Sequence, residues 1–163
     1  MSEPFILHGD ECVNGTPYHM IGNVLRTKLV VSDAAGSATV MVNTVTPHNG
    51  PPLHQHPFEE SFYILDGAFV FEIDGAAHAV APGDFVHVPA GVPHVFQNTT
   101  ESDARYLLVI RPAGIERYFE ECAEHAISDP GDTAAMNALG EKYGIQTLGP
   151  PMAARGNRAI PRK

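Results

Sequence analysis

The most informative stretch of the chain is Leu53-His54-Gln55-His56-Pro57-Phe58-Glu59-Glu60. Residues two apart on extended backbone point to the same face, so we expect the side chains of His54 and His56 to project together. Glu60 keeps the same parity, although Pro57 must bend or break the strand between them. Two imidazoles and one carboxylate on the same side of the backbone would form a metal-binding corner.

A second stretch, Gly83-Asp84-Phe85-Val86-His87-Val88-Pro89-Ala90-Gly91-Val92-Pro93-His94-Val95-Phe96-Gln97-Asn98, offers a fourth donor. A turn at Gly91 and Pro93 would present His94 where the next strand starts. Three imidazoles and a carboxylate suit Fe, Mn, Ni, Co or Zn as divalent ions, and do not suit calcium or magnesium. We therefore expect one divalent transition metal per chain, with coordination positions left open. The alternative is that these are ordinary hydrogen-bonded histidines in a protein that has lost its metal.

The region around both stretches, from about residue 26 to residue 112, is rich in Val, Ile, Phe, Tyr and Thr and is interrupted by turns. The predicted strands are Arg26–Ser32, Thr39–Thr46, Glu60–Leu65, Ala68–Ile73, Ala76–Val80, Phe85–Val88, Val95–Asn98 and Arg105–Ile110. Asp66-Gly67 and Asp74-Gly75 each join two of these runs and are typical of hairpin turns. Many short strands at close spacing predict a sandwich or a barrel.

The sequence pattern changes after Pro112. Apolar residues at helical spacing predict one helix over Gly114–His125 and a second over Thr133–Tyr143, with Asp132 as N-cap and Gly144 as C-cap. We expect a single domain over residues 1–163, consisting of a barrel (22–112), a C-terminal helical segment (113–148) and a basic tail (149–163).

Composition excludes several classes of protein. The 163 residues are 44% hydrophobic, which is ordinary for one globular domain and excludes wholesale disorder. Ten basic residues against nineteen acidic ones give a formal charge of -9, which would repel nucleic acid. Apolar runs are much shorter than the roughly 18 to 20 residues that cross a bilayer. Two cysteines do not make a disulfide framework, and the first residues show no secretory signal, so we expect a cytoplasmic protein without nucleic-acid or membrane partners.

Together, the two histidine-containing stretches resemble the two motifs of the cupin superfamily. The first motif, His-x-His, three residues, Glu, six residues, Gly, is met by His54, His56, Glu60 and Gly67. The second, Gly, five residues, Pro-x-Gly, two residues, His, three residues, Asn, is met by Gly83, Pro89, Gly91, His94 and Asn98. One departure is visible, because the family's glycine six residues before the first histidine is His48 here, with Gly50 nearby. The resemblance implies a mainly β fold, an antiparallel double-stranded β-helix or jelly-roll barrel with the metal inside.

The C-terminal part, ending in Tyr143-Gly144-Ile145-Gln146-Thr147-Leu148-Gly149-Pro150-Pro151, resembles the tails of small single-domain quercetinase-like cupins. This resemblance favours a metal-dependent dioxygenase that acts on a small enolic or aromatic molecule, with the three histidines and Glu60 as ligands and Glu60 also as general base. Two alternatives stay open: an isomerase, cyclase or lyase on the same site, and a module that binds a metal or small ligand without turnover. One fold hosts many reactions, so the fold does not choose between them.

Alternation along the predicted strands indicates which side chains would line a substrate pocket. Tyr106 and Leu108 are preferred as the inward pair of the last strand, and Arg105 and Leu107 are the alternative. The predicted pocket residues are Phe62, Phe96, Tyr106, Leu108, Met41 and Phe58. A homodimer is also compatible with the sequence, because residues 18–31 could supply a strand to a partner.

Overall fold

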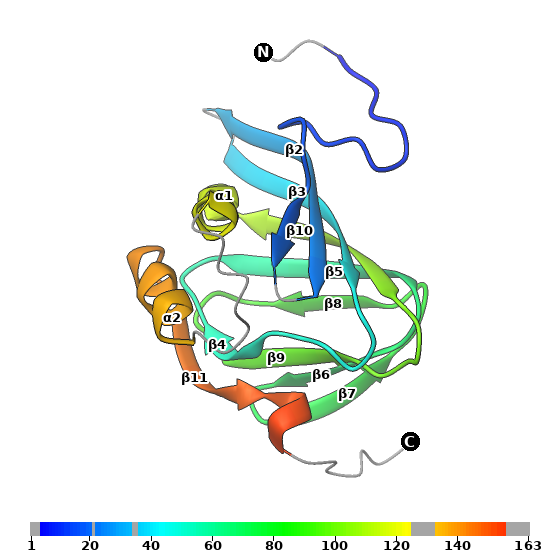
Figure 1. Cartoon of the computed structure of the whole chain (residues 1–163), viewed down its shortest axis with the longest axis vertical. Helices are drawn as coiled ribbons and strands as arrows, with labels where there is room; N and C mark the ends of the chain where they lie inside the picture. The colour runs from blue at the N-terminus through cyan, green and yellow to red at the C-terminus, as the bar shows by residue number, and fades with distance from the viewer. Residues whose placement is uncertain (1–3, 21, 34–35, 125–132, 156–163) are drawn as a thin grey trace.

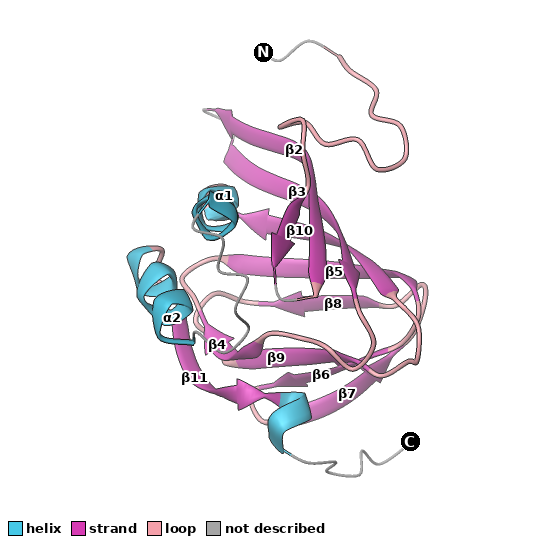
Figure 2. Cartoon of the chain, in the orientation of Figure 1, coloured by secondary structure: helices cyan, strands magenta, loops and turns pink. Residues whose placement is uncertain are grey.

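The computed structural model of the chain describes residues 4–20, 22–33, 36–124 and 133–155, and it consists of two antiparallel sheets with helices at one end (Figures 1 and 2). The six-stranded sheet runs in the order β1 (Tyr18–Met20), β2 (Asn23–Asp33), β3 (Gly36–Val45), β10 (Ala104–Arg111), β5 (Glu59–Asp66) and β8 (Phe85–Val88). The five-stranded sheet runs in the order β11 (Gln146–Pro151), β4 (Pro52–Gln55), β9 (His94–Asn98), β6 (Phe69–Ile73) and β7 (Ala76–Val80). The predicted jelly-roll architecture is confirmed.

The core lies between the inner faces of the two sheets. In β10, buried residues alternate with more exposed ones, as expected for a strand with one buried face. The pairing register then aligns inward residues across neighbouring strands, so that Leu108 faces Met41 on β3 and Phe62 on β5. Phe62 is only 1% exposed, and burying such a side chain stabilises a fold by about 1.5–3 kcal/mol.

The two Asp-Gly turns have different roles. Asp74 and Gly75 both have positive φ, 48° and 78°, and Ile73 pairs with Ala76, so the predicted two-residue hairpin is confirmed. The prediction for Asp66-Gly67 is wrong, because β5 and β6 belong to different sheets and do not pair. Gly67 is needed there for another reason: its φ is 77°, and a Cβ would lie 2.5 Å from the Cβ of Ala104.

The two C-terminal helices, α1 (Ile115–Glu124) and α2 (Thr133–Lys142), lie at the same end of the sheets (Figure 1). Ile115, Tyr118 and Cys122 form the buried face of α1. The chain turns after α2 at Gly144, whose φ is 76°, as predicted for a C-cap. The predicted N-cap, Asp132, lies outside the described residues. Neither helix, nor any other in the described part of the chain, has the length and apolar character needed to span a membrane.

Strand β11 corrects the expected division of the C-terminal part. It begins inside the segment predicted to be helical, continues into the predicted tail, and pairs with the edge of β4. The 3-10 helix η1 (Met152–Arg155) follows, and Arg155 reaches Glu72 on β6 at 3.0 Å. Pairing satisfies backbone groups that an exposed edge of β4 would leave open. Because Gly and Pro disfavour strands, the sequence of β11 gave no sign of this role.

Candidate metal centre

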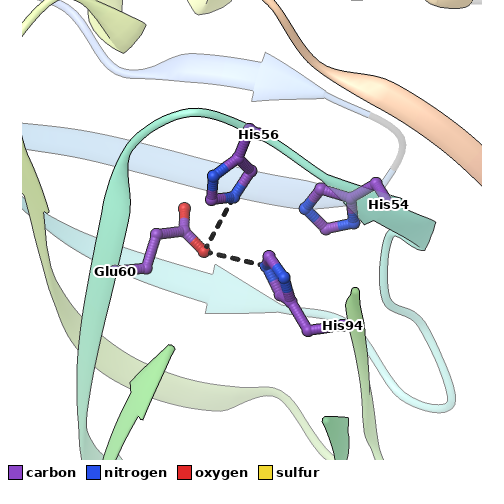
Figure 3. Close-up of side chains that lie close together, drawn as sticks. All are labelled: His54, His56, Glu60 and His94. Atoms are coloured by element: carbon purple, nitrogen blue, oxygen red, sulfur yellow. Dashed lines mark hydrogen bonds and ion pairs between the residues drawn. The ribbon is translucent and has the colours of Figure 1, made fainter. Parts of the chain in front are cut away.

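His54, His56, Glu60 and His94 come together between the two sheets (Figure 3). His54 lies on β4 directly opposite His94, the first residue of β9. His56 lies in the link between β4 and β5, and Glu60 is the second residue of β5. One potential ligand atom from each of the four side chains lies within 4.8 Å of all the others.

Backbone carbonyl groups fix the orientation of all three imidazoles. The Nδ1 atoms of His54, His56 and His94 lie 2.8, 2.9 and 2.9 Å from the carbonyl oxygens of Pro52, Phe58 and Val92, respectively. A carbonyl oxygen only accepts, so each Nδ1 carries the proton, and each Nε2 keeps its lone pair when the ring is neutral. Such hydrogen bonds set the tautomer and the ring orientation of histidines that bind metals.

Glu60 is the negative charge of the cluster. Its Oε2 lies 3.2 Å from Nε2 of His94 and 3.6 Å from Nε2 of His56 (Figure 3). Burial by itself would raise the pKa of Glu60, but the imidazoles of His56 and His94 beside its carboxylate outweigh burial and bring the pKa below its usual range. The carboxylate is therefore ionised at neutral pH.

The two histidines that face each other across β4 and β9 have pKa values shifted in opposite directions. Burial, followed by the charge of His94, lowers the pKa of His54 to about 4. Burial also opposes the charged form of His94, but its contact with Glu60 and the carbonyl of Val92 raise its pKa above the usual value. At neutral pH, His54 is therefore a neutral base.

The donor atoms of this cluster fit a metal ion. The Nε2 atom of His56 is buried and has no hydrogen-bond partner among the described residues, which is costly unless a ligand uses its lone pair. Two nitrogen donors about 2.1 Å from one ion lie about 3 Å apart when adjacent and about 4.2 Å apart when opposite. The observed spread, within 4.8 Å, is close to this range. The four residues could therefore hold one metal ion.

Comparison with known proteins agrees with this geometry. Residues 41–110 match the family described as Cupin domain. Over 98 residues, the chain is 31% identical to Protein SchB of Streptomyces halstedii, a match that covers 59% of this chain and 71% of SchB. The chain belongs to the cupin family.

Two further similarities of this cupin differ in what they show. Over 62 residues it is 44% identical to acireductone dioxygenase of Rhodopseudomonas palustris, which is 36% of each protein. The solved structure of KdgF from Halomonas sp. aligns with a TM-score of 0.54 and 18% identity, covering 67% of this chain and 98% of KdgF. At this identity, the second comparison shows the fold alone.

The loops of the cupin motifs hold the site together. The amide of Gly91 donates to the carbonyl oxygen of His56 at 2.8 Å, which ties the turn before β9 to the link before β5. Asn98 is fully buried, and its side-chain amide donates to the carbonyl oxygens of Val45, Thr46 and Ser102. The last residue of the second motif therefore anchors loops, and it is not among the four clustered donors.

At His48, where the chain departs from the cupin pattern, the backbone has a conformation that is typical of glycine. His48 has a φ of 57°, the left-handed conformation that glycine adopts without strain. Gly50 meets a different requirement, because a Cβ there would lie 1.9 Å from the carbonyl oxygen of Phe96. The loop before β4 therefore has two special backbone positions, one at His48 and one at Gly50.

The residues predicted to line a substrate pocket are all buried, and several pack on one another. Tyr106 and Leu108 are 4% and 3% exposed, so the preferred inward pair is confirmed, and the alternative pair with Arg105 and Leu107 is wrong. The rings of Phe62 and Phe96 each lie within 6 Å of the Tyr106 ring. Their contact with a substrate stays a prediction.

Phe58 has a closer relation to the cluster than the sequence indicated. Its ring stacks on the imidazole of His56, with centroids 3.8 Å apart and planes within 9°, and its carbonyl is the acceptor for Nδ1 of the same histidine. The backbone acceptors at Pro52, Phe58 and Val92 carry no sequence signal, because every residue has a carbonyl group.

Proposed function

We propose that this cupin is a metal-dependent dioxygenase of the quercetinase-like type, acting on a small enolic or aromatic substrate. The observation that carries the proposal is the convergence of three carbonyl-oriented imidazoles and one ionised carboxylate. The similarity to a protein named acireductone dioxygenase supports oxygen chemistry at such a site. This donor set suits iron, manganese, nickel, cobalt or zinc as a divalent ion.

His54, His56, Glu60 and His94 would hold the ion. When bound, such an ion supplies Lewis acidity and orients the reacting oxygen atoms. The histidines keep their orientation throughout, because each Nδ1 stays bonded to a backbone carbonyl. Glu60 accepts the proton of the substrate's enol or phenol at Oε2, as a general base within reach of the cluster. His56, Glu60 and His94 are 4%, 8% and 0% exposed, which limits the access of bulk water.

Elemental analysis of the protein purified without added metal tests the first half of the proposal. Dioxygen uptake by metal-loaded protein, measured on a panel of flavonols and enediols, tests the second half. We expect uptake with at least one member of the panel. Product formation without oxygen would instead indicate an isomerase, cyclase or lyase, and failure of every substrate with metal retained would indicate a binding protein.

Glu60→Gln is the variant that probes the proposed base. Because a positioned general base contributes about 10²- to 10⁴-fold, we expect this variant to keep part of its metal and to lose at least about 100-fold in turnover. Glu59→Gln is the matched control, since Glu59 neighbours Glu60 on β5 and lies 3.5 Å from Arg111, an exposed residue. Full activity of Glu60→Gln would remove Glu60 from the mechanism.

A further inference from the structure

A pocket of about 550 Å³ lies where the barrel meets the C-terminal helices. Its walls include Val30 near the end of β2, Phe58 before β5, Ile115 and Arg117 at the start of α1, and Tyr143 after α2. The four clustered donors are not among the lining residues. Because the helices form part of the wall, this pocket exists only once they are docked on the barrel.

Phe58 connects this pocket to the candidate metal centre. It lines the pocket, and its ring also stacks on His56 with centroids 3.8 Å apart. Phe58 therefore touches both the pocket and a predicted ligand. A planar molecule in the pocket would lie next to an aromatic ring, which favours offset or edge-to-face contacts.

The charge of the pocket is carried by two adjacent residues of α1. The carboxylate of Glu116 already has partners within the protein. Its Oε2 accepts hydrogen bonds from the hydroxyl of Thr39 at 2.7 Å and from the amide of Gly114 at 2.9 Å. The side chain of Arg117 is exposed, and in the described parts of the chain no carboxylate forms an ion pair with its guanidinium group. A guanidinium beside apolar walls is suited to an anion with an aromatic body.

We propose that this pocket binds small aromatic acids, with Arg117 pairing with the negative charge of the acid and Phe58 contacting its ring. The inference deepens the proposed function, on which it rests for the reaction itself, by naming aromatic acids as the substrate class. Such a substrate would reach the cluster past Phe58. The binding step needs no turnover and can therefore be tested alone.

Two fluorescent probes with the same ring systems separate charge from aromatic contact. 1-Anilinonaphthalene-8-sulfonate carries a sulfonate, and N-phenyl-1-naphthylamine does not. Both are titrated into the metal-free, full-length protein, into Arg117→Gln, and into Arg105→Gln as the control, because Arg105 is exposed on β10 and faces away from the barrel interior. We expect Arg117→Gln to weaken binding of the sulfonate about tenfold, the usual size of a charge-assisted hydrogen bond, and to change binding of the neutral probe less than twofold. The control should change neither affinity.

A second variant locates the probes. Val30 is 40% exposed at the wall of the pocket, so Val30→Trp should fold and fill the space, and binding of both probes should fall. Unchanged affinities in Val30→Trp, or an equal loss of both probes in Arg117→Gln, would overturn the inference. Failure of oxygen uptake with intact probe binding would refute only the proposed dioxygenase, so the two proposals fail separately.

Discussion

Protonation of His54 should destabilise the metal-free protein between pH 6.5 and pH 4.5. Burial, and next the charge of His94, lower the pKa of His54 from 6.5 to about 4 in the folded protein. Unfolding restores the ordinary value, so below pH 6.5 the unfolded state binds a proton at His54 more readily than the folded state. Stability therefore falls as the pH drops from 6.5, until the folded state is also protonated near pH 4.

The size of this effect follows from the two pKa values of His54. At 1.36 kcal/mol per pKa unit, values of 6.5 and about 4 give a loss of about 2 kcal/mol between pH 6.5 and pH 4.5. The lowered pKa of Glu60 acts in a different window, since its contribution is lost only as the pH falls below about 4.5. The raised pKa of His94 acts above pH 6.5, because its contribution is present below that pH and is lost as the pH rises.

Urea unfolding of chelator-treated protein, followed by circular dichroism at half-unit steps of pH, measures this loss. The free energy of unfolding should decrease between pH 6.5 and pH 4.5 in both proteins. The decrease in His54→Gln should be smaller than in the unchanged protein by about 2 kcal/mol. His78→Gln serves as the control, because His78 is exposed on β7 and should leave the slope as it was. The same slope in His54→Gln as in the unchanged protein would refute the reasoning.

Three further predictions concern the ligands and loops of the site. His94→Ala should lower the metal affinity by more than about 100-fold, because loss of a residue that only supports a ligand already lowers it by about 10- to 100-fold. Competition with a chelator measures the affinity, and the control His78→Ala should bind the metal normally. His48→Gly should raise the free energy of unfolding by about 1 kcal/mol, since the left-handed φ of 57° strains a histidine and not a glycine; a lower value in urea titrations would contradict this. Asn98→Ala should lower the free energy of unfolding by about 3 kcal/mol, because three buried or half-buried carbonyl groups lose the side-chain amide that donates to them. A decrease below about 1 kcal/mol would contradict this and show that water replaces the amide.

The elements of the barrel were predictable because strand signals are local. Alternation of buried and exposed side chains identified the positions of β5 and β10, and the positive φ values of Asp74 and Gly75 follow from the needs of a two-residue turn. The same local signal failed at Asp66-Gly67, because a turn sequence does not specify whether the next strand joins the same sheet. Strands β1, β4 and β11 are absent from the list of predicted barrel strands. The segment of β1 was expected only as a strand toward a partner, that of β4 only as extended backbone around His54, and β11 contains Gly and Pro.

The sequence alone identified the four candidate donors, because all four stand in the two motifs that resemble those of cupins. The expected common strand face is not what brings them together, since His54 lies on β4 and Glu60 on β5 of the other sheet. Only the tertiary structure decided that His94 pairs directly with His54, that backbone carbonyls orient the rings, and that Phe58 both stacks on His56 and lines a pocket beside α1. The physical reason is the separation along the chain over which each effect acts. Side-chain periodicity acts over a few residues, whereas strand pairing and helix docking depend on the packing of segments far apart in the chain.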